Sequence, residues 1–170
     1  GIFTDVQLGP SGKTKSIDAS PYTGTIFSNN PLFIDLEQLT TDEWHCILSK
    51  ETYNRICENN PNKDKNRTAY SYIFNAQEEA LKEAFYNFRN WDLPEMKSRF
   101  EEYKNKNAFW LEKDSLYEAL IIEHGNDYWL MWNSDDDKHL FNPKNDEQKS
   151  RYQSRIEELK QKYADTIEYY

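Results

Sequence analysis

Residues 69–91 read AYSYIFNAQEEALKEAFYNFRNW, and this stretch decides the class of fold. Its apolar side chains recur every three or four residues, which is the period of an amphipathic helix. These side chains are Tyr70, Ile73, Phe74, Leu81, Ala84, Phe85 and Phe88. The pattern therefore predicts one long helix from about residue 69 to residue 91.

Helical patterns continue on both sides of this stretch. Towards the N-terminus, Thr41 resembles a helix start, and Ser49 is a capping residue for a second short helix. Towards the C-terminus, Pro94 suits a first helical turn, and Gly125 provides a C-terminal cap. The predicted helices outside 69–91 begin near residues 41, 49, 94, 108 and 147, and the last two end near residues 124 and 169.

The first 40 residues have no helical period. Gly9 to Gly12 is a turn signal, and Leu32 to Leu36 is typical of a short strand or a buried extended segment. We therefore expect a mainly α fold. It comprises an irregular arm over residues 1–40, with at most a short strand, and a helical subdomain over residues 41–170 with about five to six helices.

Composition limits the classes of function. The chain has 170 residues, a net charge of −9 and a sequence pI near 4.9. An acidic surface repels phosphate backbones and anionic lipids, so we expect neither nucleic acid nor a membrane as a partner. Aromatic residues make up 15% of the chain and provide a core despite the low hydrophobic fraction of 37%. No apolar run approaches the roughly 20 residues that cross a bilayer, and no signal peptide is visible, so we expect a cytoplasmic protein.

No motif for metal or nucleophilic chemistry is present in the sequence. The histidines His45, His124 and His139 lie far apart and are predicted to be surface or capping residues. Asp135–Asp137 lacks the alternating ligands of a calcium loop and is predicted to be a solvated charge run. Gly9 to Thr14 has the wrong spacing for a phosphate loop. We therefore predict no metal and no cofactor in this chain.

Two tryptophans are the remaining signal from composition. Trp129 and Trp132 are three residues apart in a short apolar segment. Indole faces stack on the apolar faces of sugar rings. The same spacing and apolar neighbours also predict burial in the core, or a docking surface for another domain, and we favour these over a sugar site.

Several blocks of sequence recur in one known family. They are LGPSG at residues 8–12, DASPY at 18–22, NNPLFIDL at 29–36, LKEAF at 81–85, FWLE at 109–112, LYEAL at 116–120, His124–Gly125 and Trp129-x-x-Trp132. Their order and spacing resemble the start of the bacterial 4-α-glucanotransferases, the amylomaltases of glycoside hydrolase family 77. In that family an Asp-Ser-Pro-Tyr loop follows a Leu-Gly-Pro-Thr-Gly turn and precedes Asn-Pro-Leu-x-Ile-Asp-Leu.

The resemblance implies that the chain is a piece of an enzyme. The family fold is a (β/α)8 barrel, which alone needs roughly 250 residues. The chain is similar to a loop after an early barrel strand plus the helical insertion subdomain that follows. The resemblance places the three catalytic acids of the family beyond Tyr170. It implies that this region walls the substrate groove. The alternative is a helical protein-interaction or glucan-binding module without a catalytic role.

The resemblance also assigns candidate site residues. It implies that Ser20 and Tyr22 contact the donor sugar, since these positions match the family's Ser-Pro-Tyr. Phe74 matches an aromatic position of a second glucan site, although residues 13–17 carry no aromatic partner for it. Trp129 and Trp132 remain candidates for an aromatic docking surface. The implied partners are an α-1,4-glucan or maltooligosaccharide and the remaining barrel of the same protein.

Overall fold

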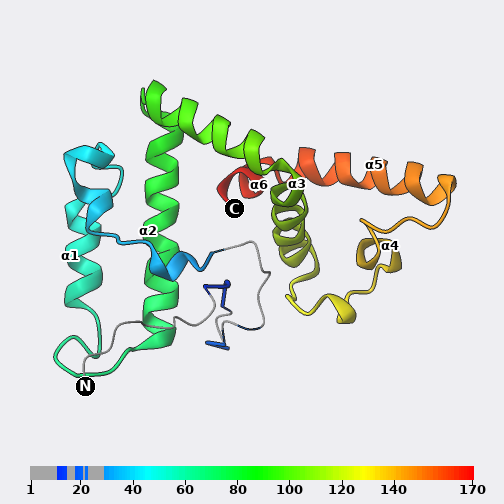
Figure 1. Cartoon of the computed structure of the whole chain (residues 1–170). Coiled ribbons are helices and arrows are strands. Elements are labelled where there is room, and N and C mark those ends of the chain that lie inside the picture. The colour runs from blue at the N-terminus through cyan, green and yellow to red at the C-terminus, as the bar shows by residue number, and fades with distance from the viewer. Residues whose placement is uncertain (1–10, 15–17, 21, 23–28) are drawn as a thin grey trace, which may run out of the picture. The chain divides into compact units, whose positions relative to one another are not determined.

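The computed structural model describes residues 11–14, 18–20, 22 and 29–170, and its regular elements are helices (Figure 1). In order they are η1 (Pro31–Phe33), η2 (Gln38–Thr40), η3 (Asp42–Trp44), α1 (Lys50–Glu58), α2 (Tyr70–Asn90), α3 (Pro94–His124), η4 (Trp129–Met131), α4 (Asp135–Lys138), α5 (Asp146–Lys162) and α6 (Ala164–Tyr169). The described residues contain one isolated antiparallel bridge, between Gly12 and Asn29. The prediction of a mainly α fold is confirmed.

Contacts divide the chain into two compact units, residues 1–94 and residues 95–170. The predicted boundary between an irregular arm over residues 1–40 and a helical subdomain over residues 41–170 stays a prediction. Two predicted features lie outside the described residues, namely the beginning of the turn at 9–12 and Pro21 of the Ser-Pro-Tyr motif. None of the helices in the described part of the chain combines the length and apolarity needed to cross a membrane.

In the first unit, α1 lies alongside α2 (Figure 1). Ser49 caps α1 as predicted, because its hydroxyl accepts a hydrogen bond from the Thr52 N–H at 3.2 Å. Glu83 on α2 ties this end down by accepting bonds from the Ser49 N–H at 2.8 Å and the Thr52 hydroxyl at 2.5 Å. The buried alanines of α2 let neighbouring segments approach the helix closely. They are Ala76, Ala80 and Ala84.

Two predictions for the segment before α1 are wrong. Leu32–Leu36 is neither a strand nor a buried extended segment, because Asn30 caps the short 3-10 helix η1 and Phe33 is 70% exposed. The helix expected from Thr41 is limited to η3. His45 and Cys46 adopt left-handed φ angles of 54° and 52°, which end the helical path at once.

In the second unit, α3 and α5 contribute to one core. The buried cluster is Leu116, Leu120, Trp132, Leu140, Tyr152 and Leu159. Gly125 follows α3 with a φ of 63°, which is the left-handed C-terminal cap that the sequence predicts. The chain therefore turns at Gly125, after the last residue of α3, and continues to η4 and the buried Trp132.

Helix boundaries in this unit differ from the prediction in two places. The two helices expected over 94–124 form the single helix α3, because no glycine or proline interrupts the polar stretch near Asn107. The Asn107 side chain bonds within the helix, donating to the Tyr103 carbonyl and accepting from the Trp110 indole. The single helix expected over 147–169 is divided into α5 and α6, since the backbone of Tyr163 leaves the helical region at φ −115° and ψ 29°.

Candidate functional site

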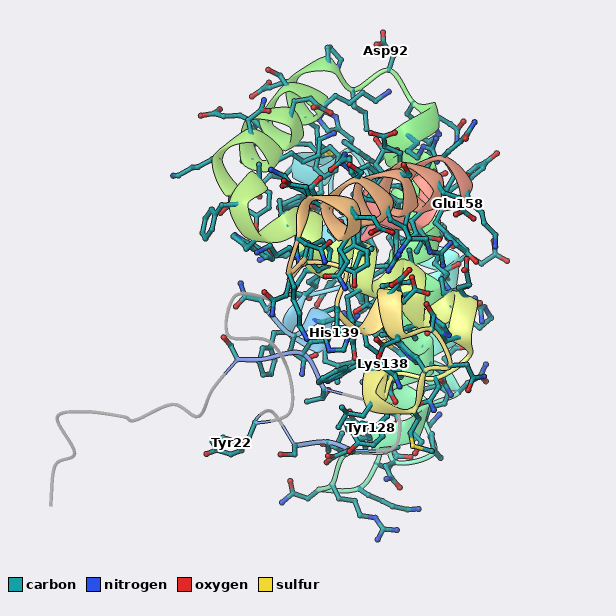
Figure 2. All side chains as sticks on the ribbon, turned by 90° about the vertical axis from the view of Figure 1, so that its right-hand side faces the viewer. Tyr22, Asp92, Tyr128, Lys138, His139 and Glu158 are labelled. Atoms are coloured by element: carbon teal, nitrogen blue, oxygen red, sulfur yellow. The ribbon has the colours of Figure 1, made fainter. Side chains whose placement is uncertain are left out.

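Ser20 and Tyr22 lie in the first unit, in the segment between Gly12 and Asn29 that we call the loop. The described residues 18–20 and 22 of this segment belong to no helix or strand. The Ser20 N–H donates a 2.9 Å hydrogen bond to the Asp18 carboxylate, which forms a local side-chain turn. Tyr22 is 80% exposed, and Figure 2 shows its side chain pointing away from the ribbon. The loop therefore presents a phenol to solvent, two residues after a half-buried serine hydroxyl.

Backbone pairing joins the two sides of this loop. The Asn30 N–H donates to the Ser11 carbonyl at 2.7 Å, next to the bridge between Gly12 and Asn29. The Ser11 hydroxyl also donates to the Asn29 side-chain oxygen at 3.1 Å. These contacts bring together the segments that precede and follow Ser20 and Tyr22.

Thr14 is the centre of a buried polar cluster that involves both sides of the loop. Thr14 is only 6% exposed. The Thr14 hydroxyl oxygen accepts hydrogen bonds from the Asn30 amide at 3.1 Å and from the Tyr70 hydroxyl at 2.8 Å. Tyr70 is the first residue of α2, so Thr14 links both sides of the loop to that helix.

A second residue of α2 holds the turn that follows the loop. The Gln77 amide donates to the Pro31 carbonyl at 3.0 Å and to the Ile34 carbonyl at 2.8 Å, and Gln77 is 7% exposed. These carbonyls belong to the first residue of η1 and to the residue that follows η1. We call Thr14, Asn30, Tyr70 and Gln77 the loop clasp.

Phe74 lies on α2 between the two helical members of the clasp. Its ring is half-buried and tilted against the ring of Tyr70, with 6.1 Å between the ring centroids. Aromatic pairs at this separation are stabilising contacts within a protein. The second glucan contact at Phe74 stays a prediction.

Trp129 and Trp132 have different surroundings in the second unit. Trp132 is 4% exposed and donates its indole N–H to the Asn126 carbonyl at 2.7 Å. Its ring stacks on His124 with 4.7 Å between centroids and an interplanar angle of 9°. Trp129 is 42% exposed. Exposed neighbours accompany it on the same short segment, namely Tyr128, Leu130 and Met131. Only Trp129 of the pair presents substantial ring area to a partner, and its docking role stays a prediction.

Charged side chains gather beside Trp132. The Arg155 guanidinium donates to both Asp137 oxygens, at 2.9 and 3.1 Å, and also pairs with Glu123. The His124 imidazole contacts the second Asp137 oxygen at 2.9 Å. We call Glu123, His124, Asp137 and Arg155 the Arg155 cluster.

The Arg155 cluster shifts the titration of its carboxylates. Burial alone raises the pKa of Glu123, but hydrogen bonds from Arg155 and its other donors outweigh burial and lower that pKa to about 2. Burial also opposes ionisation of Asp137, yet the bonds from Arg155 and His124 hold its pKa below the ordinary value of 3.8. Both carboxylates are therefore charged near neutral pH and serve as structural partners of Arg155.

The model of one protein family, described as 4-alpha-glucanotransferase, matches residues 3–170. The chain belongs to this family, glycoside hydrolase family 77. The match covers both compact units and includes the loop of Ser20 and Tyr22.

Curated members of the family agree with this assignment. The chain is 32% identical over 128 residues to the 4-alpha-glucanotransferase of Thermus thermophilus, which covers 75% of the chain and 23% of that relative. It is 33% identical over 129 residues to the enzyme of that name from Clostridium butyricum, covering 76% and 24%. A third relative of the same name, from Aquifex aeolicus, is 28% identical over 136 residues, covering 78% and 24%. The chain thus spans about a quarter of the length of these relatives. No solved structure matches it.

Sequence reasoning missed the Arg155 cluster. Asp137 was predicted to be solvated, but it is 5% exposed, and His124 is not a simple surface or capping residue. The sequence signal that could have shown a helix here is Ser134, whose hydroxyl caps α4 by accepting from the Asp137 N–H at 3.1 Å. Among the described residues, no group of three His, Cys, Asp or Glu side chains could hold a metal ion.

Proposed function

We propose that this chain forms part of a 4-α-glucanotransferase, that it walls the groove for an α-1,4-glucan, and that Ser20 and Tyr22 contact the donor sugar. The observation that carries the proposal is the family match over residues 3–170. The exposure of Tyr22 and the held turn at Ser20 support it, because both hydroxyl groups lie on one loop anchored to α2.

The proposed reaction is a glycosyl transfer with retention. A carboxylate nucleophile attacks the anomeric carbon, and a carboxylic acid protonates the departing 4-oxygen, which leaves a covalent glycosyl-enzyme. The 4-hydroxyl of an acceptor glucan then attacks the same carbon, and its proton passes to the carboxylate that served as the acid. A new α-1,4 bond replaces the one that was broken. In this proposal the catalytic carboxylates belong to the three quarters of the enzyme that this chain does not span.

The role of this chain in the reaction is binding and orientation. A hydroxyl donates one hydrogen bond and accepts others, so Ser20 and Tyr22 suit the alternating hydroxyls of a glucose ring. Tyr22 also offers a flat ring for stacking on the apolar face of the sugar. The proposal includes a cytoplasmic location, which the free thiols of Cys46 and Cys57 support, because cytosolic proteins keep their cysteines reduced. The remaining barrel of the same enzyme is the proposed partner.

Calorimetric titration of the chain with maltoheptaose tests the proposal. We expect Ser20→Ala and Tyr22→Phe each to weaken binding by about three- to tenfold, the effect of removing one hydrogen bond. Tyr86→Phe is the matched control, since Tyr86 is another exposed tyrosine, 66% accessible on α2. Equal affinity of the wild type, Ser20→Ala and Tyr22→Phe would contradict the assigned contacts. The chain alone is expected to release no glucose from maltotriose, and measurable release would contradict the assignment of the catalytic carboxylates to the rest of the enzyme.

A further inference from the structure

We infer that Tyr70 and Thr14 are positioning residues for the donor-sugar loop, and that the loop clasp sets where Ser20 and Tyr22 lie relative to α2. The inference rests on the proposed function for the identity of the ligand. Its geometry rests on contacts among described residues, so it is testable without sugar.

The hydroxyl oxygen of Thr14 is fully used as an acceptor. A hydroxyl oxygen has two lone pairs, and the Asn30 amide and the Tyr70 hydroxyl occupy both. Because Thr14 is almost completely buried, losing either donor leaves one lone pair of its oxygen without a partner and away from water. The arrangement of these three residues is therefore tightly specified.

Asn30 connects this centre to the turn that follows the loop. Its amide donates to Thr14, while its side-chain oxygen accepts from the Leu32 N–H at 3.0 Å. Its backbone N–H and carbonyl pair with Ser11 and Phe33. An aspartate in this place would keep the acceptor and lose the donor. Asparagine is thus the side chain that caps η1 and holds Thr14 at once.

Helix α2 provides a rigid base for both sides of the loop. Tyr70 and Gln77 are seven residues apart, which is close to two helical turns, so they share one face about 10 Å apart along the axis. Tyr70 bonds to Thr14 on the side of the loop that precedes Ser20, and Gln77 bonds to η1 after the loop. Ser20 and Tyr22 lie between these two anchors in the sequence. Fixing both anchors on one helix limits the positions that the sugar-contacting side chains can adopt.

A second tyrosine of α2 provides a matched control. The Tyr72 hydroxyl donates to the Ile56 carbonyl at 2.7 Å, so this bond joins α2 to α1. Tyr70→Phe and Tyr72→Phe each delete one hydroxyl of the same helix, and with it a hydrogen bond to another segment. A general loss of stability would affect Ser20 and Tyr22 equally in both variants, whereas a positioning role would affect them only in Tyr70→Phe.

The first experiment uses the chain without sugar. Backbone NMR order parameters of Ser20 and Tyr22 are expected to fall from about 0.85 to below about 0.6 in Tyr70→Phe and in Thr14→Val. They are expected to stay at the wild-type value in Tyr72→Phe and in Thr14→Ser, which retains the accepting hydroxyl. Order parameters that are already low in the wild type, or unchanged in Tyr70→Phe and Thr14→Val, would overturn the inference.

The second experiment adds maltoheptaose to the same variants. We expect Tyr70→Phe to bind about three- to tenfold more weakly than the wild type, and Tyr72→Phe to bind as the wild type does. Wild-type binding at Ser20 and Tyr22 that Tyr70→Phe leaves intact would overturn the positioning role. If the wild type shows no binding at these residues, the proposed function fails, while the order parameters still decide the structural part of the inference.

Discussion

The loop clasp and the Arg155 cluster both hold distant segments of the chain together, but they do so with different chemical groups. Each joins segments that are distant in the sequence through buried side chains. The loop clasp uses neutral hydroxyl and amide groups, with Thr14 as a shared acceptor. The Arg155 cluster uses an ion pair to Asp137, whose side chain is 3% exposed. The Arg155 cluster therefore depends on charge and on apolar packing around it, whereas the loop clasp depends on single hydrogen bonds.

The surroundings of the two regions also differ. The Arg155 cluster adjoins Trp132, which belongs to a continuous apolar core. The loop clasp holds a part of the chain in which the side chains of Phe33 and Tyr22 are exposed. Single substitutions in the second unit should therefore lower the free energy of unfolding most. Substitutions at the loop clasp should change that free energy less and should mainly weaken the contacts of Ser20 and Tyr22 with the ligand.

The largest expected effect concerns the two tryptophans. Trp132→Ala removes a buried ring and should lower the free energy of unfolding by about 4 kcal/mol. Trp129→Ala is the control and should cost less than about 1 kcal/mol, because its ring is partly exposed. Urea denaturation followed by hydrogen exchange of the α5 amides measures both. Similar losses in the two variants would break the distinction between core and surface tryptophan.

The next effect separates two arginines of α5 that both pair with acids of α4. Arg155→Met leaves Asp137 buried without its guanidinium partner and should cost about 3 kcal/mol. Arg151→Met removes an exposed pair with Asp136 and should cost less than about 1 kcal/mol. The same denaturation experiment compares them. Equal costs would show that burial of the Arg155 cluster is energetically unimportant.

The smallest expected effect is a difference in pH dependence. The pKa of Glu123 falls from 4.5 to about 2 on folding, so its stabilisation is present above pH 4.5 and is lost as pH decreases towards 2. The lowered pKa of Asp137 acts in the same direction. Hydrogen exchange of α3 and α5 should therefore accelerate as pH falls over this range, after correction for intrinsic rates, and Glu123→Gln should flatten the change. An unchanged profile in Glu123→Gln would contradict the assignment.

Much of the fold was predictable because local signals agree with it. The apolar period of α2, the Ser49 cap, Pro94 at the start of α3 and the Gly125 cap all appear in the sequence and in the structure. The short strand or buried extended segment expected at Leu32–Leu36 was wrong, since a short apolar run does not reveal that Asn30 will cap a 3-10 turn.

The candidate site was less predictable. The family resemblance selected Ser20 and Tyr22, but not the residues of the loop clasp. Thr14 and Tyr70 are 56 positions apart, and no periodicity connects them. Likewise, Asp137 becomes a buried partner of Arg155 only after α4 and α5 pack together. Long-range polar contacts of this kind depend on tertiary structure, which patterns along a single sequence do not encode directly.

The most direct test of the central claim is an NMR titration of the chain with maltoheptaose. The signals to follow are the backbone amides of Ser20 and Tyr22 and the side-chain N–H groups of the five tryptophans. A β-1,4-linked glucan of similar length is the control. The account predicts shifts at Ser20 and Tyr22 with maltoheptaose only. Shifts confined to Trp129, or none at millimolar sugar, would contradict the claim that this loop contacts the donor glucan.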